Sequence, residues 1–158
     1  MPGYATAQHE VAVRGVADLR IRALLDRQQH ADPLGLAAKA GISSAQWPLF
    51  GLLWPAGQQL AGVMAVRPLG RDESILEIGC GLALASLVAH RRGALVTASD
   101  VHPLAGPFLL ENLRLNALAP MRYCHGDWGD GGGAAQAPRV GGRFELIIGS
   151  DVLYERDD

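Results

Sequence analysis

An apolar run that ends in an acid and two closely spaced glycines constrains this chain more than any other feature. The run, Ser74–Ala83, reads Ser-Ile-Leu-Glu-Ile-Gly-Cys-Gly-Leu-Ala. This pattern is typical of a buried strand that turns sharply into a helix, which is where doubly wound α/β proteins bind a nucleotide-like cofactor. The run therefore predicts an α/β fold with a ligand site at the glycine turn.

The chain after this turn continues the same alternation. Apolar strand patterns cover 94–99 and 121–124, and a helix that starts at His102-Pro103 separates them. The continuous apolar run at 144–149 is typical of a strand buried on both faces. Parallel strands joined by right-handed crossover helices account for this order. We therefore expect a Rossmann-like, doubly wound and mainly parallel sheet.

The first third of the chain has weaker patterns. Alternating apolar positions in 10–25 predict a hairpin, and 34–40 predicts a short helix. Trp54-Pro55 opens a clearer helix, because proline suits the first helical position. We therefore expect residues 1–47 to form a helical and hairpin extension of the same domain.

The domain prediction covers the whole chain, 1–158, with 48–158 as the cofactor-binding half. Residues 129–142 are rich in Gly, Ala and Pro and are expected to form a loop. The sequence stops where the crossover helix after the fourth strand would begin. We therefore expect a domain that is incomplete at its C-terminus.

Composition limits the functional classes. The 158 residues are 49% hydrophobic and carry a net charge of -2, which gives no general reason to expect a nucleic-acid partner. No apolar run approaches the roughly 20 residues that span a bilayer, and no leader pattern opens the chain, so we expect a cytoplasmic protein without a membrane partner. Cys80 and Cys124 lack CxxC spacing and are expected to be reduced, small apolar residues, and we expect no metal site.

The glycine turn departs from a dinucleotide fingerprint. Such a fingerprint needs a third glycine at the sixth position, where this chain has Leu84. Glu77 instead places a carboxylate at the strand end, which suits a cofactor that carries positive charge. Asp100 ends the next strand and can accept the hydroxyl hydrogens of a ribose, although it can also cap the following helix. Together with Asp151 after the fourth strand, these acids should converge on one crevice.

Four motifs in register resemble the class I S-adenosylmethionine-dependent methyltransferases. They are Glu77-Ile-Gly-Cys-Gly81, Ser99-Asp100, Asp127-Trp128 and Asp151-Val-Leu-Tyr154. The chain is most similar to the branch of seven-strand protein-lysine methyltransferases, which has a Trp near the helix before the glycine turn. The likeness runs from about Trp54 to the C-terminus and implies S-adenosyl-L-methionine as the cofactor.

The resemblance also implies roles for single residues. Gly79, Cys80 and Gly81 would line the methionine and ribose part of the cofactor, with Glu77 at the strand end and Asp100 on the ribose hydroxyls. Trp128 would cover the adenine, a use of aromatic stacking that excludes water. Trp54 would border the cofactor or staple its own helix, and Ser150 would offer a contact.

Methyl transfer to lysine requires a neutral amine, whose unperturbed pKa is about 10.4. Asp151 and Tyr154 could favour loss of the proton and aim the lone pair of the amine, which makes them the candidate catalytic residues. In the alternative interpretation Asp151 caps a helix and Tyr154 packs in the core.

Two departures from the family pattern leave the acceptor open. Ala83 stands where a third glycine is usual, and the elements that normally complete the substrate pocket do not follow Tyr154. The Asn-Pro-Pro-Tyr type signature of nucleic-acid base or glutamine methylation is absent. A protein lysine is the favoured acceptor. A small-molecule acceptor and a non-catalytic binding module are the alternatives, and a nicotinamide oxidoreductase is disfavoured by Leu84.

Overall fold

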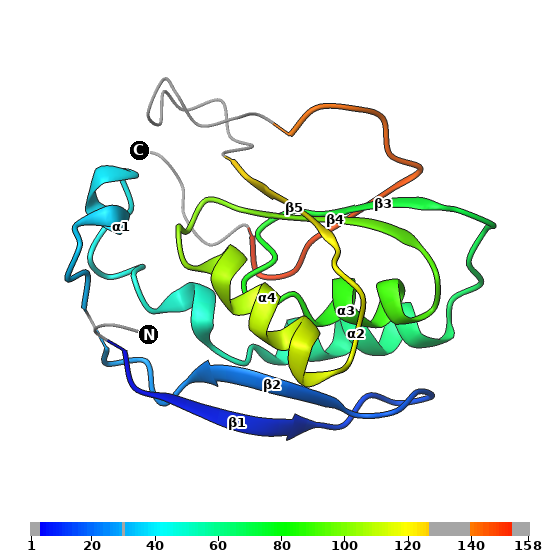
Figure 1. Ribbon diagram of the computed structural model, residues 1–158, viewed down its shortest axis with the longest axis horizontal. Coiled ribbons are helices and arrows are strands. Elements are labelled where there is room, and N and C mark those ends of the chain that lie inside the picture. Colours follow the sequence, from blue (N-terminus) through cyan, green and yellow to red (C-terminus); the bar gives the residue numbers. More distant parts are fainter. Residues whose placement is uncertain (1–3, 30, 127–139, 153–158) are drawn as a thin grey trace.

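The computed structural model describes residues 4–29, 31–126 and 140–152, and it contains a parallel sheet, three longer helices against one face of it and a separate β-hairpin below them (Figure 1). The described elements in chain order are β1 (Thr6–Val11), β2 (Leu19–Leu24), α1 (Leu36–Lys39), the 3-10 helix η1 (Leu49–Gly51), α2 (Pro55–Val66), β3 (Ser74–Glu77), α3 (Leu84–Arg91), β4 (Leu95–Asp100), α4 (Ala105–Leu115), β5 (Arg122–His125) and β6 (Leu146–Ile148).

The four strands of the main sheet run in the order β5-β4-β3-β6, and each neighbouring pair is parallel. The register pairs Leu76 with Thr97 on one side and with Ile147 on the other. The chain moves outward from β3 to β4 and β5 and then returns to the opposite side of β3 as β6. The order of strands therefore reverses at β3, and a ligand crevice is expected at such a point, beyond the carboxyl ends of the strands. These findings confirm the predicted Rossmann-like, parallel sheet.

The helix limits follow from local chemistry. Pro55 occupies the first helical position of α2, as the sequence predicts, because its missing N–H would be unpaired there in any case. Arg67 precedes Pro68 and has an extended backbone (ψ 142°), which ends α2. The guanidinium of Arg92 then donates to the carbonyl of Arg67 at 2.9 Å and satisfies one of the last carbonyls of this segment.

The hairpin is attached to the sheet domain by Asn112 of α4 and by Asn116, which caps the C-terminus of that helix. The side-chain oxygen of Asn112 accepts the N–H of Arg22 at 2.8 Å, and that of Asn116 accepts the N–H of Arg20 at 3.0 Å. The Asn116 amide also donates to the Arg20 carbonyl at 2.8 Å. These bonds satisfy the outer edge of β2, which would otherwise be open to pairing with another strand.

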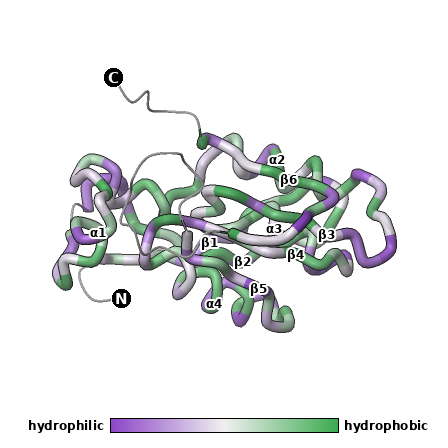
Figure 2. The backbone as a smooth tube through the Cα atoms, turned by 90° about the horizontal axis from the view of Figure 1, so that it is seen from above, coloured by the Kyte–Doolittle hydropathy of each residue, from purple (hydrophilic) through white to green (hydrophobic). Residues whose placement is uncertain are grey.

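A single hydrophobic core joins the hairpin to the sheet. Leu19 and Ile21 of β2, Phe108 of α4 and Ile75 of β3 are all fully buried in it. Figure 2 shows the hydrophobic segments running through the central strands and the helices that pack on them. The predicted N-terminal extension is thus packed into the same core as the sheet.

Two expectations about element limits are wrong. The helix predicted to start at His102-Pro103 begins at Ala105, because the backbone N–H of His102 turns back to the Asp100 carboxylate. The strand predicted over 144–149 is shorter, and its burial on both faces is contradicted because Ile147 is 60% exposed. In the described sheet β6 has a neighbour only on the β3 side, so its apolar run does not reflect full burial.

No helix among the described residues is both long enough and apolar enough to cross a membrane. Within the same residues, no group of three or more His, Cys, Asp or Glu side chains is placed to hold a metal ion.

Candidate functional site

A cavity of about 430 Å³ opens at the carboxyl ends of β3, β4 and β6, where the strand order reverses. Cavities of roughly 300 to 1,000 Å³ are typical of small-molecule sites. It is lined by Ile42, Gln46, Leu49, Phe50, Leu52, Trp54, Gly57, Glu77, Gly79, Cys80, Gly81, Leu82, Leu84, Asp100, Val101, His102, Ser150, Asp151 and Val152. The structure therefore brings the sequence-predicted residues that it describes to one place.

The two glycines of the turn line the cavity and have left-handed backbone conformations. Gly79 has φ 55° and Gly81 has φ 51°, values that favour glycine. A Cβ at Gly81 would also lie 2.9 Å from the Phe50 carbonyl oxygen, so this glycine allows η1 to approach the turn. Ala83 adopts φ 60° although it carries a side chain, which shows that this departure keeps the glycine-type backbone. Gly81 is thus required by the fold as well as by any ligand.

Most backbone N–H groups of the turn already have partners. The N–H of Cys80 donates to the Ser99 carbonyl at 2.9 Å, and that of Gly81 donates to the Asp100 carboxylate at 2.8 Å. The N–H of Ala83 donates to the Cys80 carbonyl at 2.6 Å. A pyrophosphate is normally cradled by free N–H groups of such a turn. These three N–H groups are therefore not available to a pyrophosphate.

Asp100 is held in a fixed orientation at the end of β4. Its Oδ2 accepts the Gly81 N–H and its Oδ1 accepts the His102 N–H, both at 2.8 Å. Each carboxylate oxygen has a further lone pair, so both can still accept a hydroxyl hydrogen. Burial raises the pKa of Asp100, and the two backbone bonds oppose that rise. Asp100 does not cap α4, because Leu104 occupies the N-cap position and no side chain bonds there.

Glu77 forms hydrogen bonds to α3 that the sequence does not predict. Its Oε2 accepts the backbone N–H of Ser86 at 2.9 Å and a short hydrogen bond from the Ser86 hydroxyl. Ser86 lies in the first turn of α3, so this carboxylate satisfies a donor at the helix N-terminus. Burial raises the pKa of Glu77 to about 7. The side chain lines the cavity, but one of its oxygens is committed to α3.

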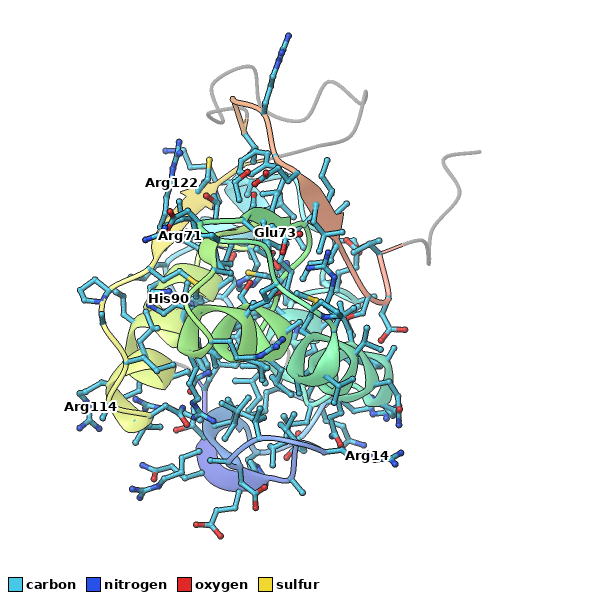
Figure 3. The ribbon with its side chains drawn as sticks, turned by 90° about the vertical axis from the view of Figure 1, so that its right-hand side faces the viewer. Arg14, Arg71, Glu73, His90, Arg114 and Arg122 are labelled. Atoms are coloured by element: carbon cyan, nitrogen blue, oxygen red, sulfur yellow. The ribbon has the colours of Figure 1, made fainter. Side chains whose placement is uncertain are left out.

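The charge of the cavity wall is acidic. Glu77, Asp100 and Asp151 line it, and no Lys or Arg does so among the described residues. Arg14, Arg114 and Arg122 are exposed and point outward from separate parts of the molecule (Figure 3). Carboxylates without basic partners favour a ligand that carries positive charge and disfavour phosphate.

The β6 end of the cavity contains Trp54, Ser150 and Asp151. The Trp54 indole N–H donates to the Leu49 carbonyl at 2.9 Å, so this ring both lines the cavity and fixes η1 against α2. Asp151 is exposed and has φ 55°, a left-handed conformation that non-glycine residues rarely adopt. Such outliers concentrate at functional sites, which is consistent with the predicted catalytic role of Asp151.

Cys80 is buried in the glycine turn, and burial raises the pKa of its thiol, so it is a neutral wall residue. Cys80 and Cys124 are both free thiols, and Cys124 is only partly buried. The candidate residues Trp128 and Tyr154 lie outside the described residues, and their roles stay predictions.

Sequence reasoning missed an entire wall of the cavity. It consists of side chains from 42–52, above all Ile42, Gln46 and Phe50, together with His102 after β4. Only the apolar cluster around Trp47-Pro48 could have drawn attention to this segment, and its 3-10 helix has no periodicity to detect. The wall is brought to the glycine turn by tertiary packing.

The fold is similar to that of solved Rossmann-like methyltransferases. No family model matches the chain. A solved Thermus thermophilus 16S rRNA N2 G1207 methyltransferase, in complex with AdoMet and guanosine, matches 94% of this chain and 33% of its own, with a TM-score of 0.53 and 18% identity. At that identity the likeness concerns the fold.

The sequence is similar to the electron transfer flavoprotein beta subunit lysine methyltransferases. The rat protein (Rattus norvegicus) is 30% identical over 112 residues, or 70% of this chain. The Xenopus laevis protein is 29% identical over 116 residues, again 70% of this chain. The match covers 41% of the rat protein and 42% of the Xenopus protein, so this chain spans less than half of either relative.

Proposed function

We propose that this chain is an S-adenosylmethionine-dependent methyltransferase that methylates the side-chain amine of a protein lysine. The observation that carries the proposal is the acidic cavity at the reversal of strand order, whose glycine turn has three N–H groups already bonded within the protein. That combination suits a cationic sulfonium better than a pyrophosphate. The similarity to lysine methyltransferases supports the choice of acceptor.

The residues that would hold the cofactor are those of the glycine turn and Asp100. Asp100 would accept the two ribose hydroxyl hydrogens on its remaining lone pairs, while its backbone bonds keep both oxygens in place. Gly79 and Gly81 would let the ligand approach the main chain. When bound, the cofactor supplies an activated methyl group, so alignment and exclusion of water account for most of the rate enhancement.

The chain's own catalytic task would be to present a neutral amine. A lysine amine could accept the methyl group only through a free lone pair, so it would first have to lose a proton to solvent. Asp151, exposed at the β6 end of the cavity, would hydrogen-bond the amine and orient that lone pair. Tyr154 is proposed as its partner from the sequence motif alone.

Calorimetric titration with S-adenosylhomocysteine tests the cofactor assignment. We expect one binding site, and no change in NADH fluorescence when the protein is added to that nucleotide. Asp100→Ala should weaken S-adenosylhomocysteine binding at least tenfold. A folded protein that gives no heat with S-adenosylhomocysteine would instead indicate a non-catalytic binding module.

The acceptor needs a separate assay. Transfer of a labelled methyl group should be measured to electron transfer flavoprotein beta subunit, the protein named in the relatives, and to small amines. Asp151→Asn and Tyr154→Phe should lower turnover and leave S-adenosylhomocysteine affinity unchanged. Labelling of small amines alone would favour the small-molecule alternative. A cytoplasmic location remains part of the proposal.

A further inference from the structure

His102 is a buried imidazole in the wall of the cavity to which the motifs assign no role. Only 3% of the residue is exposed, and its ring stacks on Phe50 with the centroids 3.8 Å apart and the planes 10° from parallel. The ring also borders a second, small cavity of about 40 Å³ that Tyr4 and Asp32 line. His102 therefore stands between the N-terminal segment and the end of β4.

The hydrogen bonds of the ring identify its tautomer. The backbone N–H of Leu104 donates to His102 Nδ1 at 3.2 Å, so Nδ1 carries no proton. A neutral imidazole then carries its proton on Nε2. Burial lowers the pKa of His102 to about 4, against an opposing influence of the Asp32 charge, and His125 lowers it further. The ring is thus neutral near pH 7 and offers one N–H donor.

That donor has no partner in the described structure. Nε2 of His102 is buried without a hydrogen bond. The carboxylate of Asp32, which lines the same small cavity, accepts the N–H groups of Leu36 and Ala38, each at 2.9 Å, and no bond from Nε2 reaches it. A buried donor without an acceptor is unfavourable and rare in proteins, so a group that can accept from Nε2 would be bound favourably.

The position of His102 indicates which part of a ligand it would meet. It follows Asp100, the proposed ribose contact, by two residues, whereas Ser150 and Asp151 lie beyond β6. In the strand order β5-β4-β3-β6, the proposed methyl-transfer end is thus two strands away from His102. We propose that His102 is a ligand-recognition residue whose Nε2–H donates to an acceptor on the adenosine half of the bound ligand. This role rests on the proposed methyltransferase function.

The test combines affinity with stability in His102→Phe, which keeps an aromatic ring against Phe50 and removes the donor. We expect S-adenosylhomocysteine to bind about tenfold more weakly, since one hydrogen bond is lost. The ligand-free variant should melt about 3 °C higher, because an unsatisfied buried donor is removed. His102→Gln, which retains an N–H near the position of Nε2, should recover most of the affinity.

A matched control is His90→Phe, because His90 lies on α3, does not line the cavity and bonds the Ala119 carbonyl (Figure 3). Its S-adenosylhomocysteine affinity should equal that of the wild type. Deaza and deoxy analogues of the adenosine half identify the acceptor: the analogue that lacks it should bind wild type and His102→Phe equally.

Unchanged affinity in His102→Phe would overturn the role of His102, because the donor then meets no ligand. A lower melting temperature beside that unchanged affinity would mean that the donor bonds a structural water. If wild type binds no S-adenosylhomocysteine at all, the proposed function fails first, and this result is distinct from either of those.

Discussion

The two walls of the cavity differ in how far their local sequence predicts their structure. The segment from Ser74 to Arg91 combines a strand, two glycines in left-handed conformations and a helix in one continuous stretch of chain. The opposite wall, η1 and the segment before it, has no periodic pattern and reaches the turn only because Gly81 leaves room for the Phe50 carbonyl. A locally encoded element can thus depend on one that is positioned entirely by tertiary contacts.

Adding a side chain at Gly81 should disrupt both walls at once. Gly81→Ala forces alanine into a left-handed conformation and places its Cβ 2.9 Å from the Phe50 oxygen. We expect a loss of about 3 kcal/mol in the free energy of unfolding, from backbone strain and overpacking together. Urea unfolding measures it, and S-adenosylhomocysteine binding should be lost.

The control for this substitution is Gly62→Ala in α2, where a Cβ would meet no atom within 4 Å. It should be neutral or slightly stabilising, since alanine favours a helix. Equal destabilisation by both substitutions would contradict the proposed contact between the walls.

The glycine turn should also show a pH dependence that the other wall lacks. Burial raises the pKa of Glu77 from 4.5 to about 7, so the unfolded chain loses this proton first as the pH rises. The unfolding free energy of the wild type minus that of Glu77→Gln should therefore fall as the pH rises from 4.5 to 7, and it should stay constant above pH 7. Between pH 5.5 and 7.5 we expect the difference in unfolding free energy to change by about 2 kcal/mol.

Urea titrations of both proteins across this range provide the measurement. His102, whose pKa is lowered to about 4, titrates in both proteins and cancels in the difference. Ser86→Ala removes a hydrogen bond that lowers the pKa of Glu77, so its transition should move to higher pH. Parallel curves for wild type and Glu77→Gln would show that Glu77 is not held in this environment.

The attachment of the hairpin to α4, away from both walls, should have a smaller effect. Asn112→Ala leaves the Arg22 N–H without its acceptor but also removes the unpartnered Asn112 amide. We expect a net loss of about 1 kcal/mol in unfolding free energy. Hydrogen exchange should show faster exchange at Arg22.

The neighbouring substitution Glu111→Ala breaks only a surface ion pair with Arg114 and should leave both measurements unchanged. If Asn112→Ala also changes nothing, the hairpin is held by the hydrophobic core alone.

The smallest effect is expected where the chain departs from the family pattern. Ala83→Gly would relieve the left-handed backbone at φ 60° but remove a fully buried methyl group. The two changes are each about 1 kcal/mol and of opposite sign, so the unfolding free energy should change by less than about 0.5 kcal/mol. Calorimetric melting checks this, and a large gain in stability would mean that the methyl group contributes little to packing.

Sequence reasoning succeeded where a pattern is local. Trp54-Pro55 predicted the start of α2, and the acid and glycines after β3 predicted the turn, because proline at the first helical position and glycine at positive φ are backbone requirements. It failed at β6, where the apolar run was interpreted as full burial although Ile147 is exposed. Apolarity alone does not say which faces of a strand are covered.

The sequence by itself determined the parallel α/β fold, the glycine turn and the acids that end β3 and β4, because each depends on residues close together in the chain. Only the tertiary structure decided that Glu77 bonds α3, that Asp100 holds the glycine turn, and that Phe50 and His102 complete the cavity. Those contacts join residues from different elements, and their geometry follows from packing in a common core.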